Sequence, residues 1–442
     1  ATKMSTSGDL SLVVSSGQPG TGGLKGTPVL ISVQPPPGTG RTPSDICCVI
    51  DVSWSMTMEA SVKAASGTTE SNGLSMLDIA KHAVRTVISI LGPEDRLCLV
   101  QFSRESSTVL PLTAMDAAGK AMAEDKLAKM TFGNGTDLWG GIAKGLDELQ
   151  NNRSEARLCH TLLLTDGETE NAGTVMTNLE AAKESYGGSL PGSIYTFGFG
   201  YEIDSKLLVK IAGFSDGAYG FIPDAGFVGT IFVNAVSTLL ATVSCDAFLT
   251  IKDPASVVEV LGGWERCGKD GDTINLGTLQ YGQSKDVVVI VSSEADPPVI
   301  AASLAYSSLG GKHIVQASCS KAADKAEVEV HFLRSRSVDT LRKISETAEV
   351  SSVDWGKALL RTLAEEVSAS SVSEQEKVKG LLEDILGQCC EALDQKQSWE
   401  RWGRHYLPSV MFAHQLQQCN NFKDPGVQFY GGELFADIRD VA

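Results

Sequence analysis

The chain has 442 residues, a formal net charge of −17, 42% hydrophobic residues and 21% charged residues. This length exceeds what one hydrophobic core usually organises, so we expect two or three domains. No apolar run reaches the roughly 18–20 residues of a membrane helix, and the first residues lack a signal-peptide pattern, so we expect no membrane insertion. The acidic balance argues against nucleic acid or an anionic membrane as the main partner and is compatible with cation binding.

Two β-like runs within residues 9–34 open the chain, and the Pro-rich stretch 35–43 follows them as a linker. From there to residue 241, apolar strand-like runs alternate with helical patterns. This alternation predicts an α/β domain over residues 42–241, with a doubly wound, mostly parallel sheet.

Residues 242–335 carry short β-runs separated by turns, the last of them "AEVEVHFL" at residues 326–333. They predict an antiparallel β-sandwich. The two N-terminal runs have no place in a parallel sheet, so we expect residues 1–41 to join this sandwich and the α/β domain to be an insertion. Amphipathic patterns over residues 336–442 predict a helical C-terminal region.

Ten cysteines are present, and Cys47, Cys48, Cys98 and Cys159 lie in apolar runs, where a free thiol behaves as a small hydrophobe. No C-x-x-C pair with zinc-ligand spacing occurs. We therefore expect reduced thiols and an intracellular, cytoplasmic setting.

Oxygen-bearing side chains follow two of the predicted strands. Asp51, Ser53 and Ser55 occupy alternate positions after "CCVI", and Asp166 follows "HTLLLT" within T-D-G. Thr136 lies in "GNGTD", a loop before a predicted helix. Ligands of doubly wound sheets bind beyond the carboxyl ends of the strands, so we expect these side chains to converge there. Two carboxylates and three hydroxyls favour Mg²⁺, or Ca²⁺ or Mn²⁺, over zinc.

D-x-S-x-S, a distant threonine and a distant T-D-G together resemble the metal-ion-dependent adhesion site (MIDAS) of von Willebrand factor type A domains, with all five positions filled. The resemblance implies direct coordination by Ser53, Ser55 and Thr136, and coordination through water by Asp51 and Asp166. It also implies an open metal position for a partner's Asp or Glu.

An Asp or Ser at the end of one strand is more often a helix cap than a metal ligand. The metal site is favoured because three such stretches occur in the order that the family has. Trp54 stands between the two serines of the motif. Trp54 and the loop around Tyr201, together with the polar stretch 61–73, are expected to rim the site and contact the partner.

The tail carries a second resemblance. Residues 402–432 look like the helical region that follows type A domains in proteins with Hedgehog/intein-like or RING-type ubiquitin-ligase modules, and residues 277–291 resemble the intervening β region. No cysteine follows Cys419 and no cysteine–histidine cluster precedes the first predicted strand of the α/β domain, so we expect neither module within these 442 residues.

Two catalytic alternatives stand beside this interpretation. Asp51 and Asp166 could support metal-assisted hydrolysis, but no base is evident nearby. Cys389 and Cys390 could pair with His405 or His414 as a nucleophile, although such residues on helical faces are more often core. We therefore expect a non-enzymatic protein that binds an acidic residue of a partner through Mg²⁺. The alternatives are a scaffold subunit of a ubiquitin ligase or another assembly with a structural metal and, more weakly, a metal-dependent hydrolase.

Overall fold

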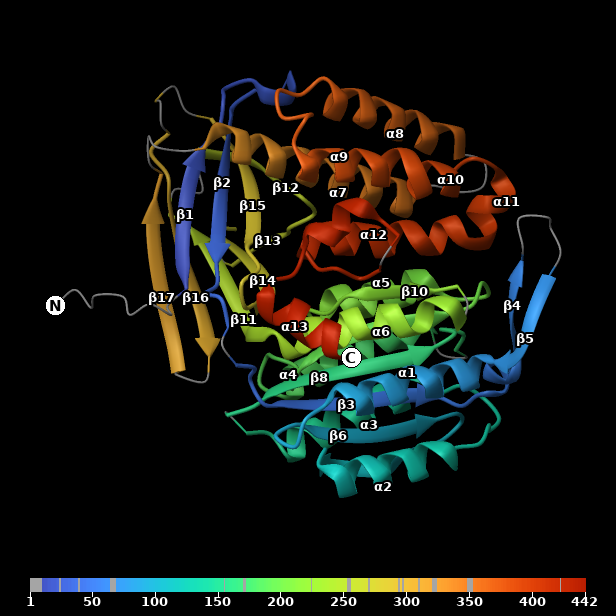
Figure 1. The fold of residues 1–442 in the computed structure, drawn as a ribbon. Coiled ribbons are helices and arrows are strands. Elements are labelled where there is room, and N and C mark those ends of the chain that lie inside the picture. Colours follow the sequence, from blue (N-terminus) through green and yellow to red (C-terminus); the bar gives the residue numbers. More distant parts are fainter. Residues whose placement is uncertain are drawn as a thin grey trace. The chain divides into compact units, whose positions relative to one another are not determined.

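Figure 1 shows the computed structural model of the chain. It describes residues 10–442 apart from the short gaps 24, 39, 64–68, 155, 170–171, 224, 253–255, 269–270, 293–294, 296–297, 309–310, 320–323, 348–352 and 422. The chain divides into two compact units. The first combines the segment up to Arg41 with Ala241–Ala436, and the second combines Thr42–Leu240 with Asp437–Ala442. The second unit is thus inserted into the sequence of the first.

The second unit is built on six strands: β3 (Ser44–Asp51), β6 (Arg96–Phe102), β7 (Ser106–Ala114), β8 (Leu158–Thr165), β9 (Ser193–Phe199) and β10 (Tyr219–Ile222). They lie in the order β10-β9-β8-β3-β6-β7. All neighbours pair in parallel except β6 and β7, which are antiparallel. The strand order reverses at β3, which has β6 on one side and β8 on the other.

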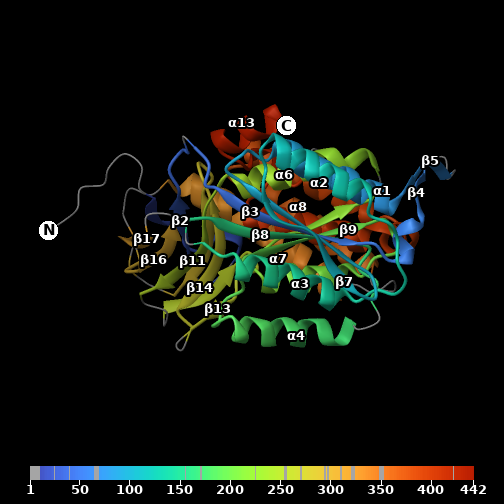
Figure 2. The ribbon, with the colours of Figure 1, turned by 90° about the horizontal axis from the view of Figure 1, so that it is seen from below.

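Six helices cover this sheet: α1 (Met76–Ile90), α2 (Ala117–Ala128), α3 (Leu138–Asn151), α4 (Ala172–Ser185), α5 (Ser205–Phe214) and α6 (Ala225–Leu240). Figure 2 shows α1, α2 and α6 on one face and α3 and α4 on the other, and α5 packs beside α4. The second unit therefore has the doubly wound α/β fold that the sequence predicted.

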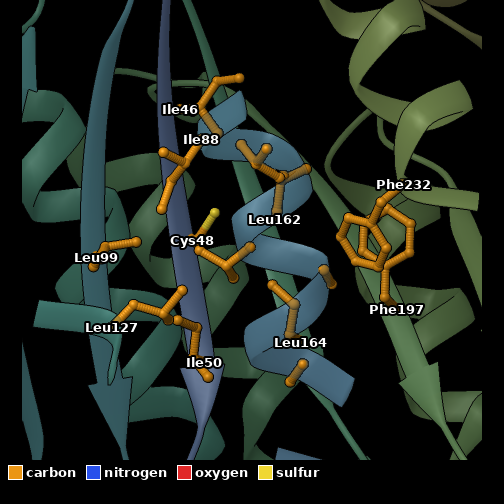
Figure 3. Packing of buried hydrophobic residues seen from close by; sticks show 14 of the residues in the cluster. Ile46, Cys48, Ile50, Ile88, Leu99, Leu127, Leu162, Leu164, Phe197 and Phe232 are labelled. Carbon is orange, nitrogen blue, oxygen red and sulfur yellow. The ribbon is translucent and has the colours of Figure 1, made fainter. Parts of the chain in front are cut away.

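The central strands are mostly apolar because helices cover both of their faces. Every residue of β3 is buried. Its Ile46, Cys48 and Ile50 belong to the cluster in Figure 3, which also takes side chains from the neighbouring strands and from α1, α2 and α6. On the opposite face, Gly145 lets α3 approach β3 closely, since a Cβ there would lie 2.6 Å from Val49 Cγ2.

Between β3 and α1 the chain forms a hairpin of β4 (Glu59–Lys63) and β5 (Thr69–Ser75). The sequence indicated only a polar stretch here, without strands. The hairpin leads directly into α1 through a capping box. Ser75 Oγ accepts a hydrogen bond from Asp78 N at 3.1 Å, and the Asp78 carboxylate accepts one from Ser75 N at 3.0 Å.

The described residues of the first unit form nine strands: β1 (Ser11–Ser16), β2 (Thr27–Gln34), β11 (Thr242–Ile251), β12 (Val257–Leu261), β13 (Arg266–Cys267), β14 (Thr273–Gln280), β15 (Lys285–Val291), β16 (Ala301–Ser308) and β17 (Gly311–Ser318). They form two antiparallel sheets, β1-β2-β15-β12 and β13-β14-β11-β16-β17. One apolar cluster takes residues from both sheets, including Val29 and Val289 from the first and Leu249 and Leu304 from the second. The sheets are therefore packed face to face as a sandwich.

The helices follow the strands: α7 (Lys325–Thr347), α8 (Val353–Ser368), α9 (Glu376–Asp384), α10 (Cys390–Ala392), α11 (Lys396–Ser398), α12 (Arg404–Leu416) and α13 (Glu433–Val441). Two π-helical turns, Ile385–Cys389 and Trp399–Gly403, and a 3₁₀ turn, Pro425–Phe429, interrupt them. This region confirms the helical C-terminal part of the predicted fold class.

The strand predicted at residues 326–333 is wrong, because this segment is the beginning of α7. Its alternation of small, charged and apolar residues has the period of a strand. Val328, Phe332 and Ser335 also have helical spacing, and all three are buried. α7 packs against β2 and β15, so the burial of a helical face on the sheet outweighs the local strand pattern.

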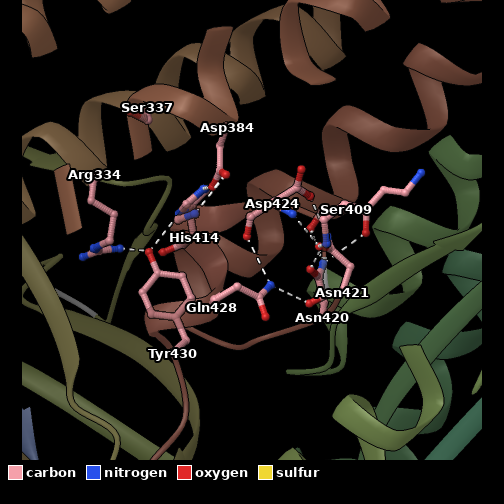
Figure 4. Close-up of polar contacts among 12 residues, drawn as sticks. Arg334, Ser337, Asp384, Ser409, His414, Asn420, Asn421, Asp424, Gln428 and Tyr430 are labelled. Carbon is pink, nitrogen blue, oxygen red and sulfur yellow. Dashed lines mark hydrogen bonds and ion pairs between the residues drawn. The ribbon is translucent and has the colours of Figure 1, made fainter. Parts of the chain in front are cut away.

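Buried polar side chains connect α7, α9 and α12 in the first unit (Figure 4). His414 Nε2 lies 3.0 Å from Asp384 Oδ2, and its Nδ1 lies 2.8 Å from the Tyr430 hydroxyl. Arg334 donates to the His414 carbonyl oxygen at 2.7 Å. His414 and Asp384 are almost fully buried, so these bonds offset the desolvation of both groups and hold the helices in one arrangement.

All ten cysteines are free thiols in the structure. Among the residues that the structure describes, no helix combines the length and the apolar character needed to cross a membrane.

β2 pairs with β1 on one side and with β15 on the other, from Lys285↔Val33 to Val291↔Thr27. A fragment of residues 242–442 would lose both N-terminal strands and expose the edge of β15, whose residues are all buried. Exposed apolar edges aggregate. We expect this fragment to be poorly soluble unless a peptide of residues 1–41 is supplied, and a fragment of residues 42–241 to fold alone. Size-exclusion chromatography and circular dichroism test both expectations, and a folded, monomeric 242–442 fragment would contradict them.

His160 should make the stability of β8 depend on pH. Its ring is fully buried with Nδ1 2.9 Å from Ser193 Oγ, and burial lowers its pKa from 6.5 to about 4. Between pH 6.5 and 4 the unfolded chain therefore binds a proton that the folded chain does not, so the free energy of unfolding falls as the pH falls through this window. Hydrogen exchange of the β8 amides, corrected for intrinsic exchange rates, should show this loss of protection in the native chain and in a His82→Leu control, which changes an exposed histidine. An equal loss in His160→Leu would rule out His160 as its source.

Candidate functional site

Asp51 is the last residue of β3 and is fully buried. Its Oδ1 accepts a hydrogen bond from Ser53 N at 2.8 Å, and its Oδ2 accepts one from Thr165 Oγ1 at 2.6 Å. Because one donor follows β3 and the other ends the adjacent strand β8, the carboxylate is fixed at the carboxyl edge of the sheet, where the order reverses.

Ser53 and Ser55 lie in the turn that follows. The chain leaves β3 and enters a 3₁₀ turn over Trp54–Thr57 with Ser53 as its N-cap. The turn brings the Oγ atoms of Ser53 and Ser55 to 3.0 Å from each other. Since Ser53 is buried, its hydroxyl faces the protein beside Asp51 rather than bulk water.

Asp166 follows β8, which pairs with β3 along its length. The carboxylate is buried, and its Oδ1 accepts a hydrogen bond from Glu168 N at 3.3 Å. Gly167 has φ +77°, and a Cβ at this position would lie 3.2 Å from Asp204 N. The glycine of T-D-G is therefore required by the backbone, because only glycine adopts this φ without strain.

Thr136 lies in the loop before α3 and is half-buried. Two hydrogen bonds tie this loop to the other segments. Gly133 N donates to Val52 O at 2.7 Å, and Thr169 Oγ1 donates to Thr136 O at 2.9 Å. The loop is thus held beside both the end of β3 and the segment after β8, and all five predicted ligands belong to segments that meet at one edge of the sheet.

Burial controls the electrostatics of the two carboxyl groups. Burial, followed by the charge of nearby Asp166, raises the pKa of Asp51 from 3.8 to about 7, although hydrogen bonds from Ser53 and Thr165 oppose the shift. Burial also raises the pKa of Asp166, and a hydrogen bond from Ser55 opposes it. Within the described chain, neither carboxylate forms a salt bridge with a lysine, arginine or histidine. Two buried acids that repel each other without a counter-ion are a local electrostatic strain.

The donor set fits a hard divalent cation. It combines two carboxylates and three hydroxyls, all oxygen, which suits Mg²⁺, Ca²⁺ or Mn²⁺. No group of three or more His, Cys, Asp or Glu side chains that could hold a metal occurs among the described residues, so a site here would depend on the serine and threonine hydroxyls. A bound cation would also relieve the repulsion between Asp51 and Asp166.

The two side chains predicted to contact a partner have different environments. Trp54 is 61% exposed, with its ring centroid 5.4 Å from that of Phe132 in an edge-to-face arrangement. Tyr201 is half-buried, and its ring lies 6.2 Å from that of Phe221. Tyr201 follows β9 in the loop that leads to Asp204, whose backbone approaches Gly167. Both tyrosine and tryptophan therefore belong to loops at the edge that holds the site.

Thr165 is a site residue that the sequence interpretation did not single out. It is fully buried, donates to Asp51 and accepts a hydrogen bond from Gly167 N at 2.8 Å. Its position as the first residue of T-D-G was the available signal. The cysteine–histidine alternative gains no support, because burial raises the pKa of the Cys389 thiol well above its ordinary value and His414 is engaged by Asp384 and Tyr430.

Comparison with protein families identifies two regions. Residues 45–232 match the family described as von Willebrand factor type A domain, and residues 375–442 match the family described as VWA / Hh protein intein-like. The first match confirms the resemblance of the α/β domain to a type A domain, and the second confirms the resemblance of the tail to the region that follows such domains.

Curated relatives share only part of their length with this chain. The probable E3 ubiquitin-protein ligase WAVH2 of Arabidopsis thaliana is 32% identical over 118 residues, which are 26% of this chain and 16% of that protein. E3 ubiquitin-protein ligase WAV3 of the same plant is 30% identical over 129 residues, 29% of this chain and 15% of that protein. The uncharacterized protein sll0103 of Synechocystis sp. (strain ATCC 27184 / PCC 6803 / Kazusa) is 25% identical over 190 residues, 41% of this chain and 38% of that protein.

Solved structures share the fold over most of the chain. A von Willebrand factor type A protein from Catenulispora acidiphila has a TM-score of 0.61 at 15% identity and aligns with 87% of this chain and 91% of its own. The ArnB paralog VWA2 from Sulfolobus acidocaldarius has a TM-score of 0.55 at 14% identity. The alignment covers 90% of this chain and 99% of that protein's chain. The type A fold and its additional β and helical parts therefore recur together in other proteins.

The site geometry predicts one divalent cation. We expect isothermal titration calorimetry of the full chain to show a single Mg²⁺ site, and Asp51→Ala or the isosteric Asp51→Asn to abolish it, because each removes a charged ligand at the centre of the set. Asp95→Asn is the matched control. Asp95 is equally buried but lies before β6, at the opposite edge of the sheet, where its carboxylate accepts from Ser44 N and Gly92 N. Mg²⁺ binding that survives in both Asp51 variants would refute the assignment.

Proposed function

We propose that the second unit is a metal-ion-dependent protein-interaction module. It would bind an acidic residue of a partner protein through Mg²⁺, or Ca²⁺ or Mn²⁺, held by Asp51, Ser53, Ser55, Thr136 and Asp166. The observation that carries this proposal is the pair of buried, mutually repelling carboxylates beside hydroxyl groups at the carboxyl edge of a type A sheet.

The protein's own groups have distinct tasks in this proposal. Thr165 and the Ser53 amide orient the Asp51 carboxylate, and Gly167 sets the turn that carries Asp166. The hydroxyls of Ser53, Ser55 and Thr136 add oxygen ligands without adding negative charge. A bound Mg²⁺ would supply the positive charge that a partner's carboxylate needs.

Charge explains why the metal is needed. A chain of net charge −17 repels an acidic ligand, but salt screens charges beyond about 8 Å at physiological ionic strength. At the site itself, two carboxylates would repel the ligand directly. A divalent cation offsets the charges of both carboxylates, so an acidic residue of a partner would bind only to the metal-loaded protein.

We propose a non-enzymatic role in an intracellular, cytoplasmic setting, which the ten free thiols support. A metal-dependent hydrolase is the weaker alternative. The described hydrogen bonds of Asp51 and Asp166 are with hydroxyl groups and backbone amides, and no general base is among these partners. Metal-dependent turnover of a substrate would favour the hydrolase.

A scaffold subunit of a ubiquitin ligase or of another assembly is the second candidate. Two of the curated relatives are named E3 ubiquitin-protein ligases, and the C-terminal family match extends the resemblance beyond the type A domain. In this case the metal would stabilise the fold. Unfolding on chelation would favour the scaffold, whereas loss of a partner without unfolding would favour the interaction module.

If the second unit is an interaction module, its capture of partner proteins should depend on the metal. We expect proteins retained from native extract in Mg²⁺ to be lost in EDTA, and Thr136→Ala to weaken retention about tenfold or more, because it removes one ligand from a surface loop. Circular dichroism should show that both treatments leave the fold intact. Thr113→Ala, on the edge strand β7, is the control and should retain partners normally. Equal capture in EDTA or in Thr136→Ala would indicate a partner surface elsewhere, such as the helical tail.

A further inference from the structure

Exposed apolar side chains gather beside the candidate metal site. Among the described residues of Thr42–Leu240, five large apolar side chains are exposed: Trp54, Met58, Leu74, Met122 and Phe132. Four of them, all except Met122, belong to the 3₁₀ turn after β3, the hairpin end that leads into α1, or the loop before α3. We call Trp54, Met58, Leu74 and Phe132 the apolar rim.

A ring contact joins two members of the rim, and backbone hydrogen bonds fix the turn end that carries Met58. Trp54 and Phe132 lie edge to face at 5.4 Å. Met58 closes the 3₁₀ turn by donating its N–H to Ser55 O at 2.9 Å, and Met76 N donates to Met58 O at 3.0 Å. Leu74 precedes Ser75, which pairs with Glu59, so the backbone at Leu74 lies beside the segment that follows Met58.

The rim and the candidate ligands share the same backbone segments. Trp54 stands between Ser53 and Ser55, so one turn positions the indole and both hydroxyls. Phe132 precedes Gly133, whose N–H donates to Val52 O at 2.7 Å and holds the Thr136 loop in place. A group bound at the metal would therefore lie beside an apolar surface whose position is fixed relative to it.

We propose that the apolar rim binds an apolar side chain of the partner segment, next to the acidic residue that reaches the metal. This inference rests on the proposed function and specifies the class of partner: an Asp or Glu with Leu, Ile, Met or Phe within two positions. Trp54 and Phe132 are 61% and 55% exposed, and aromatic side chains exposed in this way dominate the centres of protein interfaces. A basic neighbour is the competing class, because Trp54 and Phe132 offer ring faces to a cation whereas Met58 and Leu74 do not.

The test uses the full chain and an array of synthetic peptides with a central Glu, flanked within two positions by Leu, Phe, Ser or Lys. In MgCl₂ we expect peptides with Leu or Phe to bind at least tenfold more tightly than those with Ser or Lys. Phe132→Ala and Met58→Ser should each reduce this preference at least threefold. Met122→Ala is the matched control, because Met122 is 49% exposed on α2, outside the rim segments, and should keep the preference.

The outcomes separate this inference from the function on which it rests. Binding that needs both Mg²⁺ and the central Glu but does not depend on the flanking residue would refute the role of the apolar rim. The proposed metal-dependent module would still be supported. A preference for Lys would likewise refute this role of the rim, in favour of a cation–aromatic contact. Apolar binding that persists in EDTA or with Gln at the centre would overturn the metal-dependent function itself. Circular dichroism of each variant excludes misfolding as the cause of any loss.

Discussion

Two carboxylates are buried within electrostatic reach of each other, and neither can move away. Asp51 is held by Thr165 and by the Ser53 amide, and Asp166 is held by the turn that Gly167 makes possible. Ionising both groups in this environment is unfavourable, because burial removes their hydration and each repels the other. Bound protons, or a cation beside the two groups, would relieve this repulsion.

Much of this edge of the sheet could be predicted from sequence. β3 and β8 are continuous apolar runs, and the residue that follows such a run in a parallel sheet must lie at its carboxyl edge. Asp51, Ser53, Ser55 and Asp166 follow those two strands directly, so their position required no knowledge of distant contacts. Thr136 was predicted from its place in the loop before a helix, and the hydrogen bonds to Val52 and Thr169 that hold this loop beside the site are not visible in the sequence.

Other features depend on contacts that no local pattern contains. Threonine is common in strands, so its residue type alone does not distinguish Thr165. Its role in the site follows from the pairing of β8 with β3. Phe132 is an isolated aromatic in a loop until Trp54 is brought beside it. The segment that opens α7 has a strand's alternation, and its helical state reflects packing on β2 and β15. The hairpin after β3 is polar throughout most of its sequence, so hydrophobic periodicity could not reveal it.

The pairing of β2 with β15 has a consequence for the growing chain on the ribosome. Val29 pairs with Val289, so about 260 residues must be synthesised after Val29 before its partner strand exists. At roughly 5–20 residues per second this takes on the order of ten to fifty seconds. During that delay the inserted unit can complete its own core, whereas the buried face of β2 has only β1 beside it. Nascent β2 is therefore a segment whose protection by chaperones should matter, because the synthesis of β15 decides when β2 can become native.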